Sequence, residues 1–420
     1  MGIRLFAVPK DFCRIFPADG KEGTRRQHFL IGLTACAVDS EQTAMHKITY
    51  FPLDNAETLR LDINSNARKV LVDYADRRDP NNKFDLRCDL PTLLKEDLKA
   101  ADRDYYDVVA FTHLDDDHIC GAGDFFYFEH ATSRQSEGRI KMEEMWVPAF
   151  AVVESSLEGD SLTIRKEARY RLKELKGKGI RVFSAPGTLK DWFEANDLDL
   201  DDYRRRGIVL DAGKLIPTFS LAADNAEFFI HSPFASRTED GVLHVRNTDA
   251  IVMQAVFDVG GQHTKFLITA DVPYDQLDEI VRVTKLKKNE TRLEWDVYDV
   301  VHHCSYKSLG PEKGKDKTVP SENVQWLLDQ GRKGGLFVSS SRWIPNDDSD
   351  PQPPHRQAAA TYQETADDID GEFVVTMEHP KKTSPEPLVI EVTARGAALK
   401  RAVIASVGGG ALGGAAPRVG

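Results

Sequence analysis

The chain has 420 residues, 41% of them hydrophobic, which is enough to bury a substantial core in one large domain or two. Its formal net charge of -12 argues against a general nucleic-acid coat protein, because non-specific binding to phosphates depends on Lys and Arg. The odd number of cysteines and the lack of a CxxC pair fit a reducing compartment. No apolar run approaches a membrane span, so we expect a cytoplasmic protein without a membrane segment.

The first half of the chain predicts strands that alternate with helices. Residues 1–45 hold strand-like pieces around a charged loop and are expected to form an N-terminal extension. The elements that follow are strands at 47–51, 57–63 and 69–74, a helix at about 90–101, a strand at 108–111, a helix at about 162–176 and a strand at 180–184. This alternation indicates α/β layering.

Several residues of the types that bind metal ions follow closely after the apolar strand at 108–111. In an extended backbone, the side chains of His113, Asp115 and Asp117 would lie on one face, and His118 could join them from the next turn. Mixed nitrogen and oxygen donors suit zinc, manganese or iron, and the carboxylates move the preference toward manganese. An alternative interpretation is an acidic loop that caps a helix beginning near Gly121.

Three strands in the second half also end in metal-competent residues. The strand at 227–230 is followed by His231, the strand at 266–270 by Asp271, and the strand at 297–301 by His302 and His303. Open α/β architectures place their sites beyond the carboxyl ends of strands, so we expect these residues to converge with the first group. Taken alone, a histidine at a strand end such as His231 is more often structural than a ligand.

These residues occur in an order that resembles the metallo-β-lactamase superfamily. The motifs that carry the resemblance are His113-x-Asp115-x-Asp117-His118, Asn247-Thr248-Asp249, Thr269-Ala270-Asp271 and His302-His303-Cys304-Ser305. The chain more closely resembles the nuclease-like domain of the ComEC type of DNA-uptake protein and its stand-alone soluble relatives. The resemblance covers about residues 47–392.

The resemblance implies an αββα sandwich with a dinuclear metal site at one edge, formed by a domain at 46–395. It implies two divalent ions, zinc or manganese. Their ligands would be His113, Asp115 and His231 for one ion, Asp117 and His118 for the other, Asp271 as a bridge, and His303 to complete the second site. His302 would then contact the transition state, although the two adjacent histidines could exchange these roles. Asp117 would also orient the attacking water.

The expected chemistry is phosphodiester hydrolysis, with a nucleic acid or nucleotide as the substrate. Ser305, Lys307 and Ser308 form a polar series suited to a phosphate oxygen, or else a loop that caps the next helix. His355 either contacts the substrate or is a solvated loop residue. The alternatives are a hydrolase of lactones, amides or thioesters on the same fold, and a metal-stabilised subunit without turnover.

Further expectations concern segments and residues beside the site. Cys120 and Cys304 stand where the family has glycine, and they either fill space as small apolar side chains or act as metal-binding or oxidation-sensitive thiolates. Residues 125–184 are expected to form an insertion or lid. Residues 396–420 are expected to hold the end of a strand and a disordered tail rich in Gly and Ala.

Overall fold

The computed structural model describes residues 45–234 and 249–401. The expected N-terminal extension lies almost entirely outside these ranges, and so does the tail from residue 402. Within the described ranges, no helix has the length and apolar character needed to cross a membrane.

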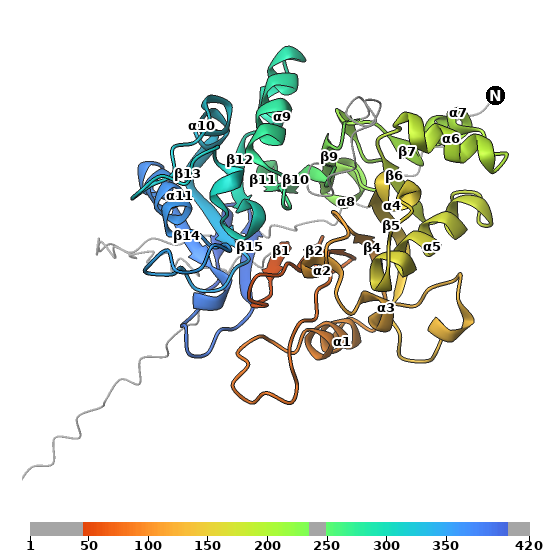
Figure 1. The fold of residues 1–420 in the computed structure, drawn as a ribbon, viewed down its shortest axis with the longest axis horizontal. Coiled ribbons are helices and arrows are strands. Elements are labelled where there is room, and N and C mark those ends of the chain that lie inside the picture. Colours follow the sequence, from red (N-terminus) through yellow and green to blue (C-terminus); the bar gives the residue numbers. More distant parts are fainter. Residues whose placement is uncertain (1–44, 235–248, 402–420) are drawn as a thin grey trace, which may run out of the picture. The chain divides into compact units, whose positions relative to one another are not determined.

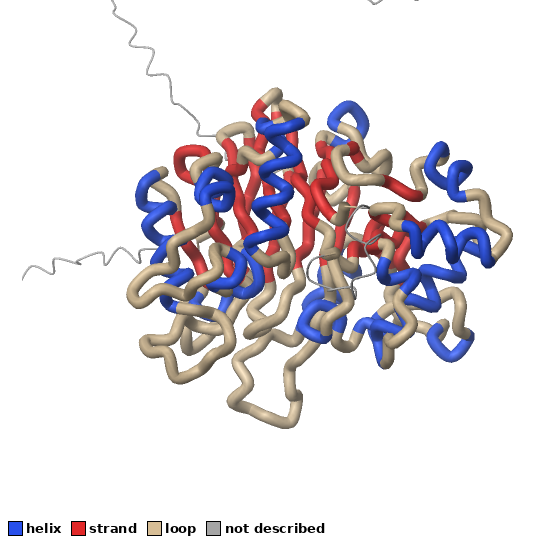
Figure 2. Tube along the Cα trace, turned by 45° about the horizontal axis from the view of Figure 1, so that its top comes forward, coloured by secondary structure: helices blue, strands red, loops and turns tan. Residues whose placement is uncertain are grey.

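Two large β-sheets form the centre of the described part (Figure 1; Figure 2). In spatial order, the nine-stranded sheet contains β16 (Gly396–Leu399), β15 (Leu388–Thr393), β1 (His46–Tyr50), β2 (Leu59–Ile63), β3 (Arg68–Val72), β4 (Tyr105–Ala110), β5 (Lys141–Pro148), β6 (Ile180–Phe183) and β7 (Val209–Leu210). The seven-stranded sheet contains β14 (Glu372–Val375), β13 (Gly331–Ser339), β12 (Trp295–Asp299), β11 (Gln262–Ile268), β10 (Val252–Val259), β9 (Ala226–Ser232) and β8 (Lys214–Leu215).

The two sheets pack face to face because their strands are apolar on both faces. In β4, Val108 and Ala110 belong to the core that both sheets share, whereas Val109 and the following Phe111 belong to the core on the outer face of the nine-stranded sheet. The alternation follows from the two-residue period of a strand. Fully buried strands of this kind require cover on both sides.

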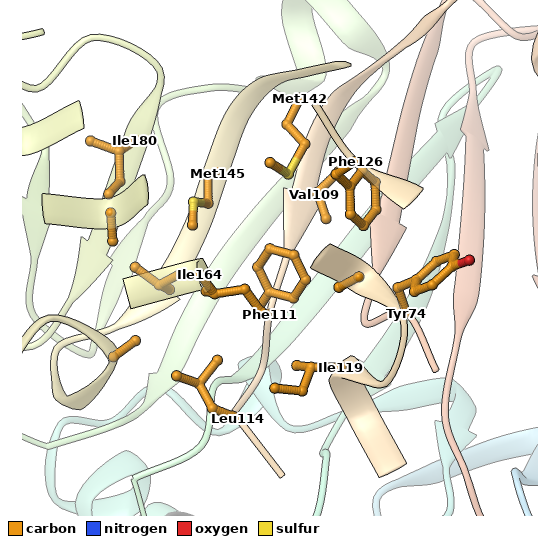
Figure 3. Close-up of a cluster of buried hydrophobic side chains, with 14 of the residues drawn as sticks. Tyr74, Val109, Phe111, Leu114, Ile119, Phe126, Met142, Met145, Ile164 and Ile180 are labelled. Atoms are coloured by element: carbon orange, nitrogen blue, oxygen red, sulfur yellow. The ribbon is translucent and has the colours of Figure 1, made fainter. Parts of the chain in front are cut away.

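Helices supply that cover on the two outer faces. The outer core of the nine-stranded sheet receives side chains from α1 (Leu90–Ala100), α4 (Phe150–Val153), α5 (Gly159–Lys173) and α6 (Gly187–Ala195), and part of this core is shown in Figure 3. The seven-stranded sheet is covered by α9 (Tyr274–Leu286), α10 (Glu322–Leu328) and α11 (Arg356–Asp368). In α1, Leu90, Leu94 and Leu98 recur every four residues and form one buried stripe. The predicted αββα sandwich is therefore confirmed.

Residues 125–184 have a different place from the one expected. This range contributes β5 and β6, which lie between β4 and β7 in the nine-stranded sheet, and it contributes α5 to the outer helical layer. The length of a segment does not distinguish a lid from part of the sandwich. Most of the segment is instead part of the sandwich, because its apolar residues pair with and cover neighbouring strands.

Candidate metal centre

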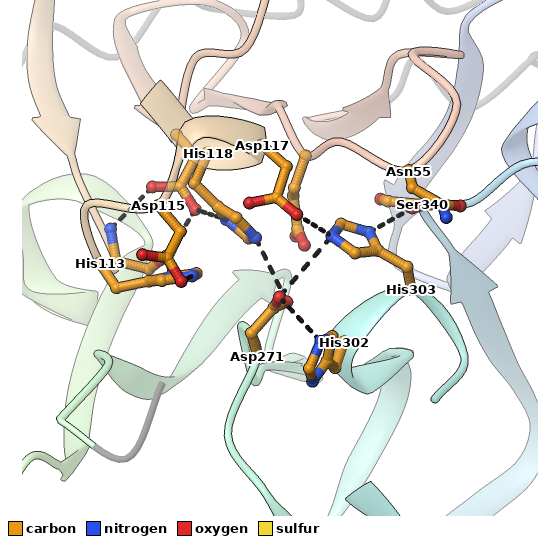
Figure 4. A network of polar contacts seen from close by, with 12 residues as sticks. Asn55, His113, Asp115, Asp117, His118, Asp271, His302, His303 and Ser340 are labelled. Carbon is orange, nitrogen blue, oxygen red and sulfur yellow. Dashed lines mark hydrogen bonds and ion pairs between the residues drawn. The ribbon is translucent and has the colours of Figure 1, made fainter. Parts of the chain in front are cut away.

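Parallel pairing directs several strand ends toward one edge of the sandwich. β4 runs parallel to β3 and β5 in one sheet, and β12 runs parallel to β11 and β13 in the other. The chain beyond β4 leads to His113, the chain beyond β11 leads to Asp271, and the chain beyond β12 leads to His302 and His303. Figure 4 shows these side chains pointing toward one another.

Four of the predicted ligands form a compact group. Each of Asp117, His118, Asp271 and His303 offers one ligand atom, and these atoms lie within 4.8 Å of one another. His118 Nε2 is 3.2 Å from Asp271 Oδ1, and His303 Nε2 is 3.5 Å from Asp117 Oδ2. His302 lies beside the group, with its Nε2 3.6 Å from Asp271 Oδ2.

His113 and Asp115 adjoin this group. The ring centroids of His113 and His118 are 4.0 Å apart, and His113 Nε2 is 3.9 Å from Asp115 Oδ2. The backbone does not stay extended as expected, because the short helix α2 (Asp116–Ile119) begins directly after Asp115. Asp117 and His118 therefore reach the site from a helical turn. Asp115 is the residue at the start of α2, yet its side chain makes no capping hydrogen bond there.

Buried polar atoms in this group fit a metal ion. Among the described residues, the Nε2 atoms of His113, His118 and His303 and the Oδ1 atom of Asp271 are buried without a hydrogen-bond partner. The 3.2 Å contact between His118 and Asp271 is thus a close approach of charges that lacks hydrogen-bond geometry. Burying such atoms without partners is costly, and bound cations would satisfy them. Imidazole and carboxylate donors together suit zinc, manganese or iron.

The opposite ring nitrogens of the histidines are held by the protein. His118 Nδ1 lies 2.7 Å from Asp73 Oδ2, and His303 Nδ1 lies 2.7 Å from the carbonyl oxygen of Ser340. Asp73 also accepts hydrogen bonds from the backbone N–H and the hydroxyl of Thr112. Contacts of this kind fix the ring orientation and the tautomer, so that Nε2 presents its lone pair to the centre.

Asp73 was missed by the sequence interpretation. The signal was present, because Asp73 directly follows the apolar residues of β3 in the same way that Asp271 and His302 follow their strands. Asp73 lies inside the strand predicted at 69–74, so it does not stand out as a residue that follows a strand. The contact between Asp73 and His118 spans 45 residues of sequence, so spacing could not reveal it.

Burial and neighbouring charges shift the pKa values of this group in opposite directions. Burial lowers the pKa of His113 to about 3, so this ring is neutral. Burial also opposes a charge on His118, but Asp271 and Asp73 outweigh it and raise the pKa of His118. Burial alone would raise the pKa of Asp271, yet His118 and His303 hold it well below its usual range. The carboxylate of Asp271 is thus kept ionised in spite of its burial, which is the form that binds a cation.

His231 is not part of this group. As a neighbour of Ile230, which faces the core between the sheets, it points to the opposite face of β9. Its Nε2 lies 2.9 Å from the carbonyl oxygen of Arg292, and its ring packs against Phe229. The structure therefore does not support the expected ligand role of His231, and the structural alternative describes its contacts.

The expected substrate residues lie beside the centre rather than in its cavity. A cavity of about 390 Å³ is lined by Asp117, His302 and His303, but not by Ser305, Lys307, Ser308 or His355. The hydroxyl of Ser305 accepts a hydrogen bond from the N–H of Lys307, which is the capping role given above as the alternative. His355 Nδ1 accepts a hydrogen bond from the N–H of Tyr306.

Other motif residues have separate positions. Asp249 is buried close to the site, because the N–H of nearby Ile251 donates to the carbonyl of Thr112, whereas Asn247 and Thr248 fall outside the described residues. Burial raises the pKa of the thiols of Cys120 and Cys304, and neither belongs to the four-residue group. A raised pKa disfavours the thiolate. The space-filling interpretation of both cysteines is therefore preferred.

Two further carboxyl groups are buried behind the centre. Burial raises the pKa of Asp299 to about 7, and Glu57, to which its side chain is hydrogen-bonded, also has a raised pKa because of burial. The backbone N–H of Glu57 donates to the carbonyl oxygen of Asp117 at 2.9 Å. Glu57 and Asp299 thus form a carboxyl pair that holds a proton in the folded protein.

This pair predicts a pH dependence of folding. Because the folded pKa of Asp299 exceeds the unfolded value, its contribution to stability is fully present below about pH 4 and is lost as the pH rises through about 7. We expect the metal-free protein to lose stability relative to Asp299→Asn between about pH 4 and pH 7, by up to about 1.4 kcal/mol per pH unit. Urea unfolding of both proteins measures this difference, and parallel pH profiles would refute the assignment.

Comparisons with known proteins were made by sequence and by structure. No protein-family model matches the chain, and no curated protein matches it. Similar solved structures include the metallo-β-lactamase-fold protein YhfI from Bacillus subtilis, with 10% identity, a TM-score of 0.32 and coverage of 79% of this chain and 95% of that chain. Unliganded yeast PDE1 has 10% identity, a TM-score of 0.40 and coverage of 79% and 98%.

A diphosphatase from the PhnP family is also similar, with 10% identity, a TM-score of 0.29 and coverage of 74% of this chain and 92% of that chain. Likenesses at these scores carry no argument about activity. The chain is an αββα sandwich with a candidate metal centre at one edge.

Proposed function

We propose that the chain is a metal-dependent hydrolase that cleaves phosphodiesters in a nucleic acid or nucleotide. The observation that carries the proposal is the convergence of buried, partnerless imidazole nitrogens on the carboxylates of Asp117 and Asp271. His113 and Asp115 would hold one divalent ion, Asp117, His118 and His303 would hold a second, and Asp271 would bridge them. Bound ions of this kind supply Lewis acidity for hydrolysis.

The two adjacent histidines have different surroundings. His303 is buried, and the carbonyl of Ser340 fixes its Nδ1, which suits a ligand. The side chain of His302 is 26% exposed and lines the cavity, which suits a group that donates a hydrogen bond to the substrate. The carboxylate of Asp117 also lines the cavity, where it can accept a hydrogen bond from the attacking water.

The cavity favours a charged substrate over an acyl substrate. Among the described residues, only Leu53 and Pro353 contribute apolar side chains to its lining, and the remaining lining residues are polar or charged. A lactone or thioester with an apolar acyl chain would require an apolar cleft. A phosphodiester fits the polar lining and the cationic centre that the ligands would create.

The test combines metal analysis with turnover. The purified protein is expected to contain zinc or manganese, and to hydrolyse single-stranded DNA, duplex DNA, RNA, a cyclic nucleotide or bis(p-nitrophenyl) phosphate when manganese is added. Asp117→Asn should lower turnover by about a hundredfold or more. Asp124→Asn, which changes a side chain that is 90% exposed, serves as the matched control.

Other outcomes would overturn this proposal. Hydrolysis of a lactone, amide or thioester, with no action on any phosphodiester, would assign the site to acyl substrates. Bound metal with no turnover on any of these compounds would assign the protein to the class of metal-stabilised subunits.

A further inference from the structure

Arginine side chains from distant parts of the sequence line the same cavity as the candidate metal centre. Arg77 and Arg87 come from the loop between β3 and α1, and Arg342 comes from the loop between β13 and α11. Asp117, His302 and His303 lie on the same lining. An anion held by these guanidinium groups would therefore lie in the same cavity as the candidate metal centre.

The three arginines differ in how firmly they are engaged. Arg87 is committed to Asp85, because its Nε lies 2.9 Å and its Nη2 2.6 Å from the carboxylate oxygens. Arg77 has only long contacts: its Nη1 is 3.4 Å from the carbonyl oxygen of Asn55, and its Nε is 4.0 Å from Asp116. The guanidinium of Arg77 is thus available to a ligand, whereas that of Arg87 is neutralised.

The guanidinium of Arg342 is paired through some of its N–H groups but not through all of them. Its Nη1 pairs with Asp350 at 2.7 Å, and its Nη2 makes a weak contact of 3.3 Å with the carbonyl oxygen of Gln352. Among the described residues, its buried Nε has no hydrogen-bond partner. A guanidinium has five N–H donors, so Arg342 retains donors beyond its pairing with Asp350.

Asn55 links two of the loops that line this cavity. Its side-chain oxygen accepts a hydrogen bond from the backbone N–H of Arg342 at 3.1 Å, and its side-chain nitrogen donates to the carbonyl oxygen of Pro353 at 2.5 Å. Its own carbonyl oxygen is the atom that Arg77 approaches. Asn55 therefore holds the backbone of Arg342 and contacts the guanidinium of Arg77, and both arginines line the same cavity.

We propose that Arg77 and Arg342 bind a second phosphate group of the substrate, adjacent to the phosphodiester that is cleaved. This inference rests on the proposed function and adds a substrate class: compounds that carry two neighbouring phosphates, such as oligonucleotides or terminally phosphorylated dinucleotides. Guanidinium groups suit this role because they bind phosphate oxygens through paired N–H donors. An isolated, singly charged phosphodiester would not use the site.

The kinetic test compares thymidine dinucleotides with and without a terminal phosphate at the 5′ or the 3′ end. The wild-type KM is expected to be about tenfold lower for one phosphorylated dinucleotide than for the unphosphorylated one. Arg77→Gln and Arg342→Gln should each remove most of this advantage with little change in kcat, and higher salt should reduce it in the wild type. Bis(p-nitrophenyl) phosphate has no second phosphate, so its kcat/KM should fall less in these variants than that of the phosphorylated dinucleotide.

Control variants separate binding from folding. Arg78→Gln changes the adjacent arginine, which pairs with Asp89 and does not line the cavity, so it should retain the full KM difference. Arg342→Lys keeps the charge but not the paired donors, and an intermediate KM is expected. Arg77→Gln breaks only long contacts, so it tests the site even if Arg342→Gln disturbs its loop.

A binding measurement makes the test independent of turnover. Inorganic pyrophosphate is titrated into the metal-free protein by calorimetry, and the double variant of Arg77 and Arg342 should bind it at least tenfold more weakly than Arg78→Gln. If no phosphodiester is hydrolysed but this difference is found, the anion site stands and the proposed function falls. Unchanged KM values and unchanged pyrophosphate affinity in both single variants would overturn the anion site while leaving the hydrolase proposal intact.

Discussion

Replacing Asp271 with Asn is expected to lower phosphodiester turnover by about a thousandfold and to reduce the bound metal. Asp271 lies 3.2 Å from His118 and 3.7 Å from His303, so its carboxylate is the shared neighbour of residues from both sheets. The amide keeps the volume but loses the negative charge. A loss of about 4 kcal/mol in electrostatic stabilisation corresponds to roughly three powers of ten in rate.

The measurement for Asp271→Asn pairs kcat with the metal-to-protein ratio determined by mass spectrometry. Asp258→Asn is a matched control, because Asp258 also contacts an imidazole, that of His263 at 2.9 Å, but at a partly exposed position outside the four-residue group. It should retain metal and activity. Metal content and kcat that both stay at the wild-type level in Asp271→Asn would show that this carboxylate is not part of the centre.

Replacing Asp73 with Asn is expected to weaken metal binding by about 10- to 100-fold. The carboxylate of Asp73 accepts a hydrogen bond from His118 Nδ1, which leaves the lone pair of Nε2 directed at the centre. An amide NH₂ at this position would donate to Nδ1 instead and place the proton on Nε2. The metal ligand would then have the wrong tautomer.

The test of Asp73→Asn measures activity and affinity as a function of added manganese. Excess metal should restore much of the activity, because the donor atoms themselves remain. Thr112→Val serves for comparison, because it removes a hydrogen bond to Asp73 and the 3.1 Å contact of the hydroxyl with His113 Nδ1, but leaves the contact between Asp73 and His118 intact. Its metal affinity should fall much less. If metal affinity falls equally in both variants, in proportion to a loss of thermal stability, the role of Asp73 is purely structural.

Local patterns in the sequence were sufficient to predict most elements around the site. The apolar runs before His113, Asp271 and His302 are the strands β4, β11 and β12, and the periodic leucines at 90–98 form α1. Such patterns are informative because a strand and a helix repeat every 2 and 3.6 residues, and the repeat is visible within a short window. The convergence of strand ends followed from the same elements combined with the rules of α/β architecture.

These local patterns could not predict which strands pair when they are far apart in the sequence. β15 pairs with β1 although more than 300 residues separate them, and the range at 125–184 supplies inner strands rather than a lid. No local window distinguishes an inserted segment from a sheet-forming one, because both contain apolar strands and helices. The energy that decides between them comes from burial against partners elsewhere in the chain.

The sequence by itself determined the residue types of the candidate site and their places at the ends of buried strands. Only the tertiary structure decided which face each of them uses. His231 ends a strand as Asp271 does, yet its side chain turns to the outer face, whereas Asp73, Arg77 and Arg342 arrive at the centre from positions that no spacing connects. The physical reason is that local periodicity fixes which side chains share a face of a strand or helix. Packing between the two sheets fixes which residues from elsewhere in the chain that face contacts.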